Sequence, residues 1–231
     1  MRLGVIGLFL GAMVGCGGAN QPAAPLPLPP SAAPPTAAPV ETVRVSVSDE
    51  DVGGAMPPLD DGRIQLAPPD GWRARPRKTG FVVRFYFNAN LTVPRIHVTA
   101  EDAAFAEPEV TEENLHGFVT HVAERLEGEG APLVEPVIPM VVGETPCARY
   151  VKKLRIRLTS AEGEQSLTVE RQILETVIAS RRYTIDLQTP LGKIPEFRQA
   201  GYAVAASLAS AEPSGDSGGA EATDGDDGDS P

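Results

Sequence analysis

The sequence predicts an α+β fold in which an antiparallel sheet meander packs with two helices. Strand-like segments with alternating apolar residues lie on both sides of one amphipathic helical segment, and a second helical segment follows near the end of the chain. Three strand-like runs in the second half are joined by the links AEGEQ and SRR. Parallel neighbours need a crossover of about a dozen residues or more, so links this short make these strands antiparallel neighbours.

The first strands are predicted between residues 63 and 102. Residues 63–76 read as a strand, a Pro-Asp-Gly turn and a second short strand, which indicates a hairpin. Residues 95–102 alternate apolar and polar side chains and predict a further strand. Residues 81–87 predict a strand with one buried face, which consists of Phe81, Val83, Phe85 and Phe87.

Two helices are predicted. The helix over residues 111–128 begins at Thr111, whose hydroxyl can cap the first amide groups, and the two glutamates after it suit the positive end of a helix. Residues 195–209 predict a closing helix with Pro195 at the first helical position. The apolar stripe of the first helix consists of Leu115, Phe118, Val119, Val122 and Leu126.

The strand-like runs of the second half cover residues 147–160, 166–179 and 182–190. In the first run the side chains alternate between an apolar and a basic side, which is typical of a sheet that is buried on one face. The apolar side consists of Leu154, Ile156 and Leu158, and the basic side of Lys153, Arg155 and Arg157.

These elements resemble a known fold. A Pro-Asp-Gly-Trp start, a mid-chain amphipathic helix, the run VGETPCARY before a long meander, and an ending of the form PEF…A-x-S-L are similar to the PsbP-like fold. The resemblance covers residues 62–210 and implies an α/β/α sandwich. That fold occurs in the P subunit of the photosystem II oxygen-evolving complex, in DcrB-type proteins and in many bacterial lipoproteins. Relatives with this fold mostly act through protein contacts, so the resemblance implies a binding or accessory role.

The amino terminus predicts a membrane anchor. The apolar run from Leu3 to Val14 has twelve residues, whereas a spanning helix needs about 20, so residues 1–15 are expected to be a signal peptide. Met-Val-Gly-Cys at residues 13–16 resembles the lipobox of bacterial lipoproteins, in which the cysteine is acylated and becomes the new amino terminus. Cys16 is therefore the expected lipidation site, with palmitate-type chains that hold the protein on a membrane. The alternative is a secreted protein that is cut near Gly18.

Two biased segments flank one predicted domain at residues 41–210. Residues 16–40 combine the lipidated cysteine with a proline- and alanine-rich stalk that has eight prolines and no charge between Pro22 and Pro39. A polyproline II stalk of this length extends up to about 60 Å. Residues 211–231 hold seven acids and no base, and this composition predicts a disordered acidic tail.

The sequence offers no arrangement typical of catalysis. His116 and His121 lie about 140° apart around the predicted helix, and neither they nor His97 belong to a metal-ligand motif. Phosphate-binding loops and nucleophile elbows are absent from the sequence, so we expect no enzymatic activity, no cofactor and no metal. Cys147 is expected to be a buried small hydrophobe, although a leftover cysteine in an exported protein can also be a reactive thiol.

One candidate binding face is basic. Its residues, Arg149, Lys153, Arg155 and Arg157, share one side of a predicted strand and suit anionic lipid head groups or an acidic partner. The alternative is that these cations form cross-strand ion pairs with Glu170 and Glu175 on the neighbouring strand.

A second candidate site is apolar. Trp72, Phe118 and Val122 could line a cleft between the sheet and the first helix, where a small apolar ligand would bind. The alternative is that these side chains belong to an ordinary core.

We therefore expect a lipid-anchored, non-catalytic binding or accessory domain that meets a protein partner of unknown identity at the bacterial cell envelope. Gly17 follows the predicted lipidation site in place of aspartate, which favours an outer membrane facing the periplasm in a cell with two membranes. The chain is expected to be exported and has a net charge of −11, so we do not expect nucleic acid as a partner. The alternatives are a carrier of small apolar ligands and, less favoured, an enzyme in which a histidine or Cys147 meets a carboxylate.

Overall fold

The computed structural model describes residues 40–75, 80–87, 93–160 and 163–211, without the side chains of residues 158–165. The predicted signal peptide, the lipidation site Cys16, the stalk up to Pro39 and the tail from Glu212 lie outside these residues. Within them, no helix is both long and apolar enough to cross a membrane.

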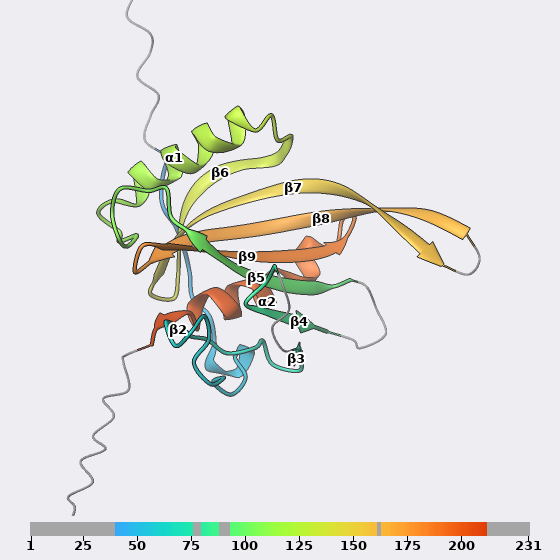
Figure 1. Ribbon diagram of the computed structural model, residues 1–231, viewed down its shortest axis with the longest axis horizontal. Helices are drawn as coiled ribbons and strands as arrows, with labels where there is room; N and C mark the ends of the chain where they lie inside the picture. Colours follow the sequence, from blue (N-terminus) through green and yellow to red (C-terminus); the bar gives the residue numbers. More distant parts are fainter. Residues whose placement is uncertain (1–39, 76–79, 88–92, 161–162, 212–231) are drawn as a thin grey trace, which may run out of the picture. The chain divides into compact units, whose positions relative to one another are not determined.

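Eight strands form one sheet, in the spatial order β1-β6-β7-β8-β9-β5-β4-β3 (Figure 1). They are β1 (Val43–Val45), β3 (Arg73–Arg75), β4 (Val83–Tyr86), β5 (Arg95–Asp102), β6 (Leu133–Val142), β7 (Thr145–Ser160), β8 (Gly163–Ile178) and β9 (Arg181–Pro190). The other elements are a short sheet of β2 (Ile64–Gln65) and β10 (Ala209–Ser210), the 3-10 helix η1 (Asp49–Asp51), and the helices α1 (Leu115–Gly128) and α2 (Ile194–Ala206).

The predicted meander is confirmed. β7 pairs antiparallel with β8 and β8 with β9, and the pair Ser160 and Gly163 closes the first hairpin. The second hairpin turns through Ala179 and Ser180, whose φ angles of 50° and 61° are those of a two-residue turn that follows the twist of the strands. One pair departs from the antiparallel pattern, because β1 runs parallel to β6.

Each face of the sheet carries its own apolar core and its own helix. Neighbouring residues of β8 point to opposite faces, so that Ile173 packs in the core under α1 and Leu174 in the core under α2. Figure 1 shows α1 on one side of β6 and β7, and α2 on the other side of the sheet. The structure is therefore α+β, with a mostly antiparallel sheet between two helices, as predicted.

Four of the five residues of the predicted apolar stripe of α1, Leu115, Phe118, Val122 and Leu126, are buried, and Val119 is partly buried. The helix itself begins later than predicted. Asn114, not Thr111, occupies the position before the helix, and its side-chain oxygen accepts the amide of Thr111 at 2.8 Å. The extra turn at residues 111–114 is closed by this asparagine, which explains the later start.

The predicted hairpin over residues 63–76 is wrong. β2 pairs with β10 at the end of the chain, and β3 pairs with β4, so the two strands of this segment do not meet. The intervening turn at Pro69–Gly71 redirects the chain from the small sheet to the edge of the large one. Local turn residues fixed where the chain turns but did not determine which strands pair.

The expected buried faces at residues 81–87 and 154–158 also need correction. Val83 and Phe85 are buried, but Phe87 is 51% exposed, and Phe81 stacks on His97 on the other face of the sheet. Leu154 is 41% exposed. We call the part of the β7–β8 hairpin that extends beyond the paired ends of β6 and β9 the outer hairpin. As Figure 1 shows, neither α1 nor α2 covers it.

Candidate functional site

The face of the sheet that α1 covers also carries two rows of mostly polar side chains beside that helix, and these rows cross six neighbouring strands. Hydrogen-bonded register places the residues of each row directly opposite one another. The first row is Arg73, Tyr86, Arg95, Gln188, Arg171 and Lys152. The second row is Arg75, Arg84, His97 and Asp186, followed by Ile173 and Tyr150 at the edge of the core under α1.

We call the polar part of these two rows the cationic face. It holds five arginines and one lysine against a single carboxylate, that of Asp186. Strand spacings of about 4.8 Å make the first row about 24 Å long from β3 to β7. The face is broad enough to contact an extended segment of another chain.

Strand alternation positions these side chains. In β4 the buried residues Val83 and Phe85 point to the core under α2, so Arg84 between them points to the cationic face. The same alternation in β5 buries Ile96 and turns Arg95 toward the cationic face. Arg84 and Arg95 are therefore fixed in direction by buried apolar neighbours that anchor their strands.

Aromatic rings hold several of the cations in place. The guanidinium carbon of Arg84 lies 4.2 Å from the ring centre of Phe81, and that of Arg75 lies 4.7 Å from the ring centre of Tyr86. Arg84 also donates a hydrogen bond of 3.0 Å to the hydroxyl of Tyr86. Stacking on a ring orders a guanidinium group and leaves the donors at its edge directed away from the ring, which suits recognition of carboxylates.

The only acid in the two rows is already engaged. Asp186 accepts 2.6 Å hydrogen bonds from Nη2 of Arg171 and from Nε2 of Gln188, and its side chain is 6% exposed. The remaining cations are Arg73, Arg75, Arg84, Arg95 and Lys152, and no described carboxylate lies within 4 Å of any of them. The cationic face therefore has an excess of positive charge.

The pKa values of the face report the same excess. Burial, and next the positive charges of Arg84 and Arg95, lower the pKa of His97 to about 4. Burial, and next the charge of Arg84, also lowers the pKa of Arg95. Because positive neighbours oppose the charging of His97 and Arg95, an anion placed over these two residues would be stabilised by the same positive charges.

The basic set predicted from the sequence does not form one surface. The side chain of Arg149 is 6% exposed and is bonded to Glu135, with Gln172 at 3.5 Å, so this arginine is part of the packed interior. The ammonium nitrogen of Lys153 lies 3.9 Å from a carboxylate oxygen of Glu170, which is the cross-strand ion pair of the alternative interpretation. Arg155 and Arg157 are exposed on the outer hairpin.

Glu175 does not pair with the basic residues of β7 that the alternative interpretation named. It is buried between the sheet and α1, where both of its oxygens accept hydrogen bonds from Arg125 at 2.9 and 2.8 Å. Tyr150 donates to the same carboxylate at 2.6 Å. This network fastens α1 to the sheet at the border of the cationic face.

The predicted apolar cleft is not brought together. Trp72 packs in the core under α2, whereas Phe118 and Val122 pack in the core under α1, on the opposite face of the sheet. The hollow beside Phe118 and His121 leaves about 0 Å³ that a water molecule could enter. A tight core of this kind does not support a ligand site between the sheet and α1.

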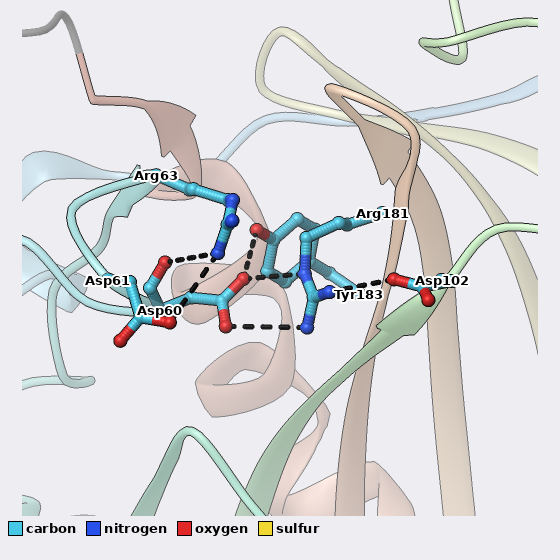
Figure 2. A network of polar contacts seen from close by, with 6 residues as sticks. All are labelled: Asp60, Asp61, Arg63, Asp102, Arg181 and Tyr183. Carbon is cyan, nitrogen blue, oxygen red and sulfur yellow. Dashed lines mark hydrogen bonds and ion pairs between the residues drawn. The ribbon is translucent and has the colours of Figure 1, made fainter.

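A second polar network holds the turn after residue 59 against the start of β9 (Figure 2). Asp60 accepts hydrogen bonds of 2.8 Å from Nε of Arg181 and from the hydroxyl of Tyr183. Arg181 also donates to Asp102 at 2.9 Å. Figure 2 shows Arg63 on the other side of the turn, where it bonds the backbone oxygen of Asp60 at 3.2 Å.

The remaining candidates for chemistry lie apart. His116 and His121 are on α1, and His97 is on β5 in the cationic face. Cys147 is 1% exposed, and burial raises the pKa of its thiol to about 12, so it is a buried small hydrophobe as predicted. Among the described residues no group of histidines, cysteines and carboxylates could hold a metal ion.

Sequence reasoning missed the cationic face although each strand carried a sign of it. Arg84 and Arg95 stand on the polar side of strands that were predicted, and Arg171 on a third. Nothing in one strand shows that these three residues lie side by side, because that depends on the register between strands far apart in the chain.

Comparisons with known proteins add a fold similarity. No family model and no curated protein matches the chain. A crystal structure of a protein from Bacteroides thetaiotaomicron VPI-5482 is similar at 16% identity, over 70% of this chain and 49% of that one, with a TM-score of 0.43. This chain thus spans about half the length of the Bacteroides protein. The solution structure of cyanobacterial PsbP (CyanoP) from Synechocystis sp. PCC 6803 is similar at 14% identity, over 71% of this chain and 95% of that one, with a TM-score of 0.36. These similarities concern the fold alone and carry no information on what this chain binds.

Proposed function

We propose that this chain is a lipid-anchored, non-catalytic binding domain that holds an acidic protein partner at the bacterial cell envelope through its cationic face. One observation carries the proposal: five cations of two adjacent rows have no described carboxylate within 4 Å, and the single acid in the rows is already paired. Cations left in excess on an ordered surface favour a complementary negative surface.

The composition of the face favours a protein over a lipid bilayer as the partner. Arginine outnumbers lysine, and its planar group binds carboxylates with two parallel hydrogen bonds. The guanidinium groups of Arg75 and Arg84 stack on aromatic rings, so their positions suit discrete carboxylates better than a mobile lipid surface. The predicted stalk, which extends up to about 60 Å, would also allow the domain to meet a partner well above the membrane.

The test is a cross-linking pull-down from the native source with two variants that lose the same charge. In the face variant, Arg73, Arg84 and Arg95 are changed to glutamine. In the control variant, Lys153, Arg155 and Arg157, on the outer hairpin, are changed to glutamine. The proposal expects one recurrent acidic envelope protein with the unchanged chain and with the control variant, and its loss with the face variant.

Two further preparations complete the test. A Cys16→Ser chain is expected to lose or weaken capture, because it lacks the predicted anchor. Anionic lipid vesicles are offered to all forms in parallel. Equal capture by the face and control variants, or vesicle binding that depends on the cationic face without any protein partner, would overturn the proposal.

A further inference from the structure

We propose that the acidic tail, residues 212–231, binds the cationic face of its own chain and competes there with the acidic partner. This inference rests on the proposed function of that face. The tail has seven acids and no base, and four of the acids fall in the run DGDDGD at residues 224–229. The cationic face offers five cations without a described carboxylate within 4 Å, so the two charges are complementary.

The structure fixes where the tail begins. The last described residue, Ala211, donates its amide to the backbone oxygen of Arg63 at 2.9 Å, next to the pairing of β10 with β2. Arg63 belongs to the turn of Asp60, which is bonded to Arg181 at the first residue of β9 (Figure 2). The root of the tail is thus held at the start of β9.

The tail is long enough to reach the cationic face from this root. Along β9, the seven residue-to-residue steps from Arg181 to Gln188 cover about 23 Å. The root lies on the α2 side, so passing to the other face of the sheet adds about 10 Å, the spacing of packed layers. Asp224 comes thirteen residues after Ala211, and an extended chain of that length spans about 45 Å.

Tethering makes a weak contact sufficient. A segment tethered to its own domain by a short linker meets its site at an effective concentration of about 1 mM, so the tail can occupy the face even if the free segment binds weakly. Exposed ion pairs are screened by salt, so the contact is reversible and a partner with more complementary contacts can displace it. We expect removal of the tail charge to strengthen binding of a free acidic peptide by about 3- to 10-fold at low salt.

The first experiment compares the unchanged chain with a tail-neutral variant of equal length, both with Cys16→Ser. The variant carries E212Q, D216N, E221Q, D224N, D226N, D227N and D229N. The readout is the NMR signal of arginine Nε–Hε groups without any ligand. The inference expects shifts at Arg84 and Arg95, and none at Arg155 or Arg157 on the outer hairpin. Unshifted signals at Arg84 and Arg95 would overturn it.

The second experiment separates failure of the tail contact from failure of the proposed function. A fluorescent peptide of ten glutamates is titrated into the unchanged chain, the tail-neutral variant and the tail-neutral variant with Arg73, Arg84 and Arg95 changed to glutamine. The expected order of affinity is highest for the tail-neutral variant and lowest when the face is neutralised as well. Equal affinity with and without the tail charge overturns the tail contact alone. An absence of face-dependent binding in the tail-neutral variant overturns the proposed function.

Discussion

Asp60→Asn tests how the turn after residue 59 is held against β9. Asp60 is 6% exposed and has a φ of 51°, a left-handed conformation that asparagine also adopts readily. The substitution therefore keeps the backbone and the side-chain shape and removes the charge. It weakens the bonds from Arg181 and leaves that guanidinium with the exposed carboxylate of Asp102.

The expected loss follows from the burial of the pair. Breaking a fully buried ion pair costs about 3–5 kcal/mol, but Arg181 is partly exposed and keeps a second partner, so we expect about 2–3 kcal/mol. The loss is measured as the free energy of unfolding in urea. With a slope of about 2 kcal/mol per molar, the midpoint falls by roughly 1–1.5 M.

The neighbouring residue supplies a matched control. Asp61 also has a positive φ, 58°, and its side chain is 69% exposed beside Arg63. Asp61→Asn should cost less than about 1 kcal/mol, as expected for an exposed pair. If the two substitutions lower the midpoint equally, the buried network does not hold the turn and the reasoning is refuted.

Three other predictions concern single residues. The pKa of His97, which burial and two neighbouring arginines lower to about 4, lies below its value of about 6.5 in an unfolded chain, so protons favour the unfolded state between these values. The free energy of unfolding, measured by urea titration, should therefore fall by about 2 kcal/mol from pH 6.5 to 4, a figure that allows for solvent screening of the partly exposed ring. A His97→Gln chain that shows the same fall would contradict this. Burial raises the pKa of the Cys147 thiol to about 12, so this thiol should not react with a thiol reagent at pH 8 until urea unfolds the chain. Rapid reaction of the native protein would show that the thiol is accessible to solvent in the folded state. Glu175→Gln should cost about 2–3 kcal/mol in thermal unfolding, because it removes the buried charge partner of Arg125 and leaves that guanidinium with only the exposed carboxylate of Glu129. A change below about 0.5 kcal/mol would show that this network does not fasten α1.

The fold could be predicted where local rules decide it. Apolar periodicity located α1, and the short link at Ala179 and Ser180 made β8 and β9 antiparallel neighbours, because a two-residue turn allows no other arrangement. The pairing of β2 with β10 joins residues about 145 positions apart, and no local signal encodes such a contact. The predicted hairpin failed for this reason.

The candidate site was missed for the same physical reason. Lys153, Arg155 and Arg157 alternate within one strand, so the sequence alone shows that they share one side of it. The cationic face is instead built from Arg73, Arg95 and other residues of different strands, which become neighbours only through the register of the sheet. Charge excess across strands is a property of the folded sheet, and one strand read alone does not contain it.

Photo-crosslinking in native cells from a residue on the cationic face tests directly whether this face meets an acidic protein. A photoreactive phenylalanine analogue replaces Tyr86, which lies in the first row between Arg73 and Arg95. The matched position is Arg155 on the outer hairpin. We expect an adduct with one recurrent acidic envelope protein from position 86 and none from position 155. An adduct from position 155 alone, or only lipid adducts from position 86, would contradict it.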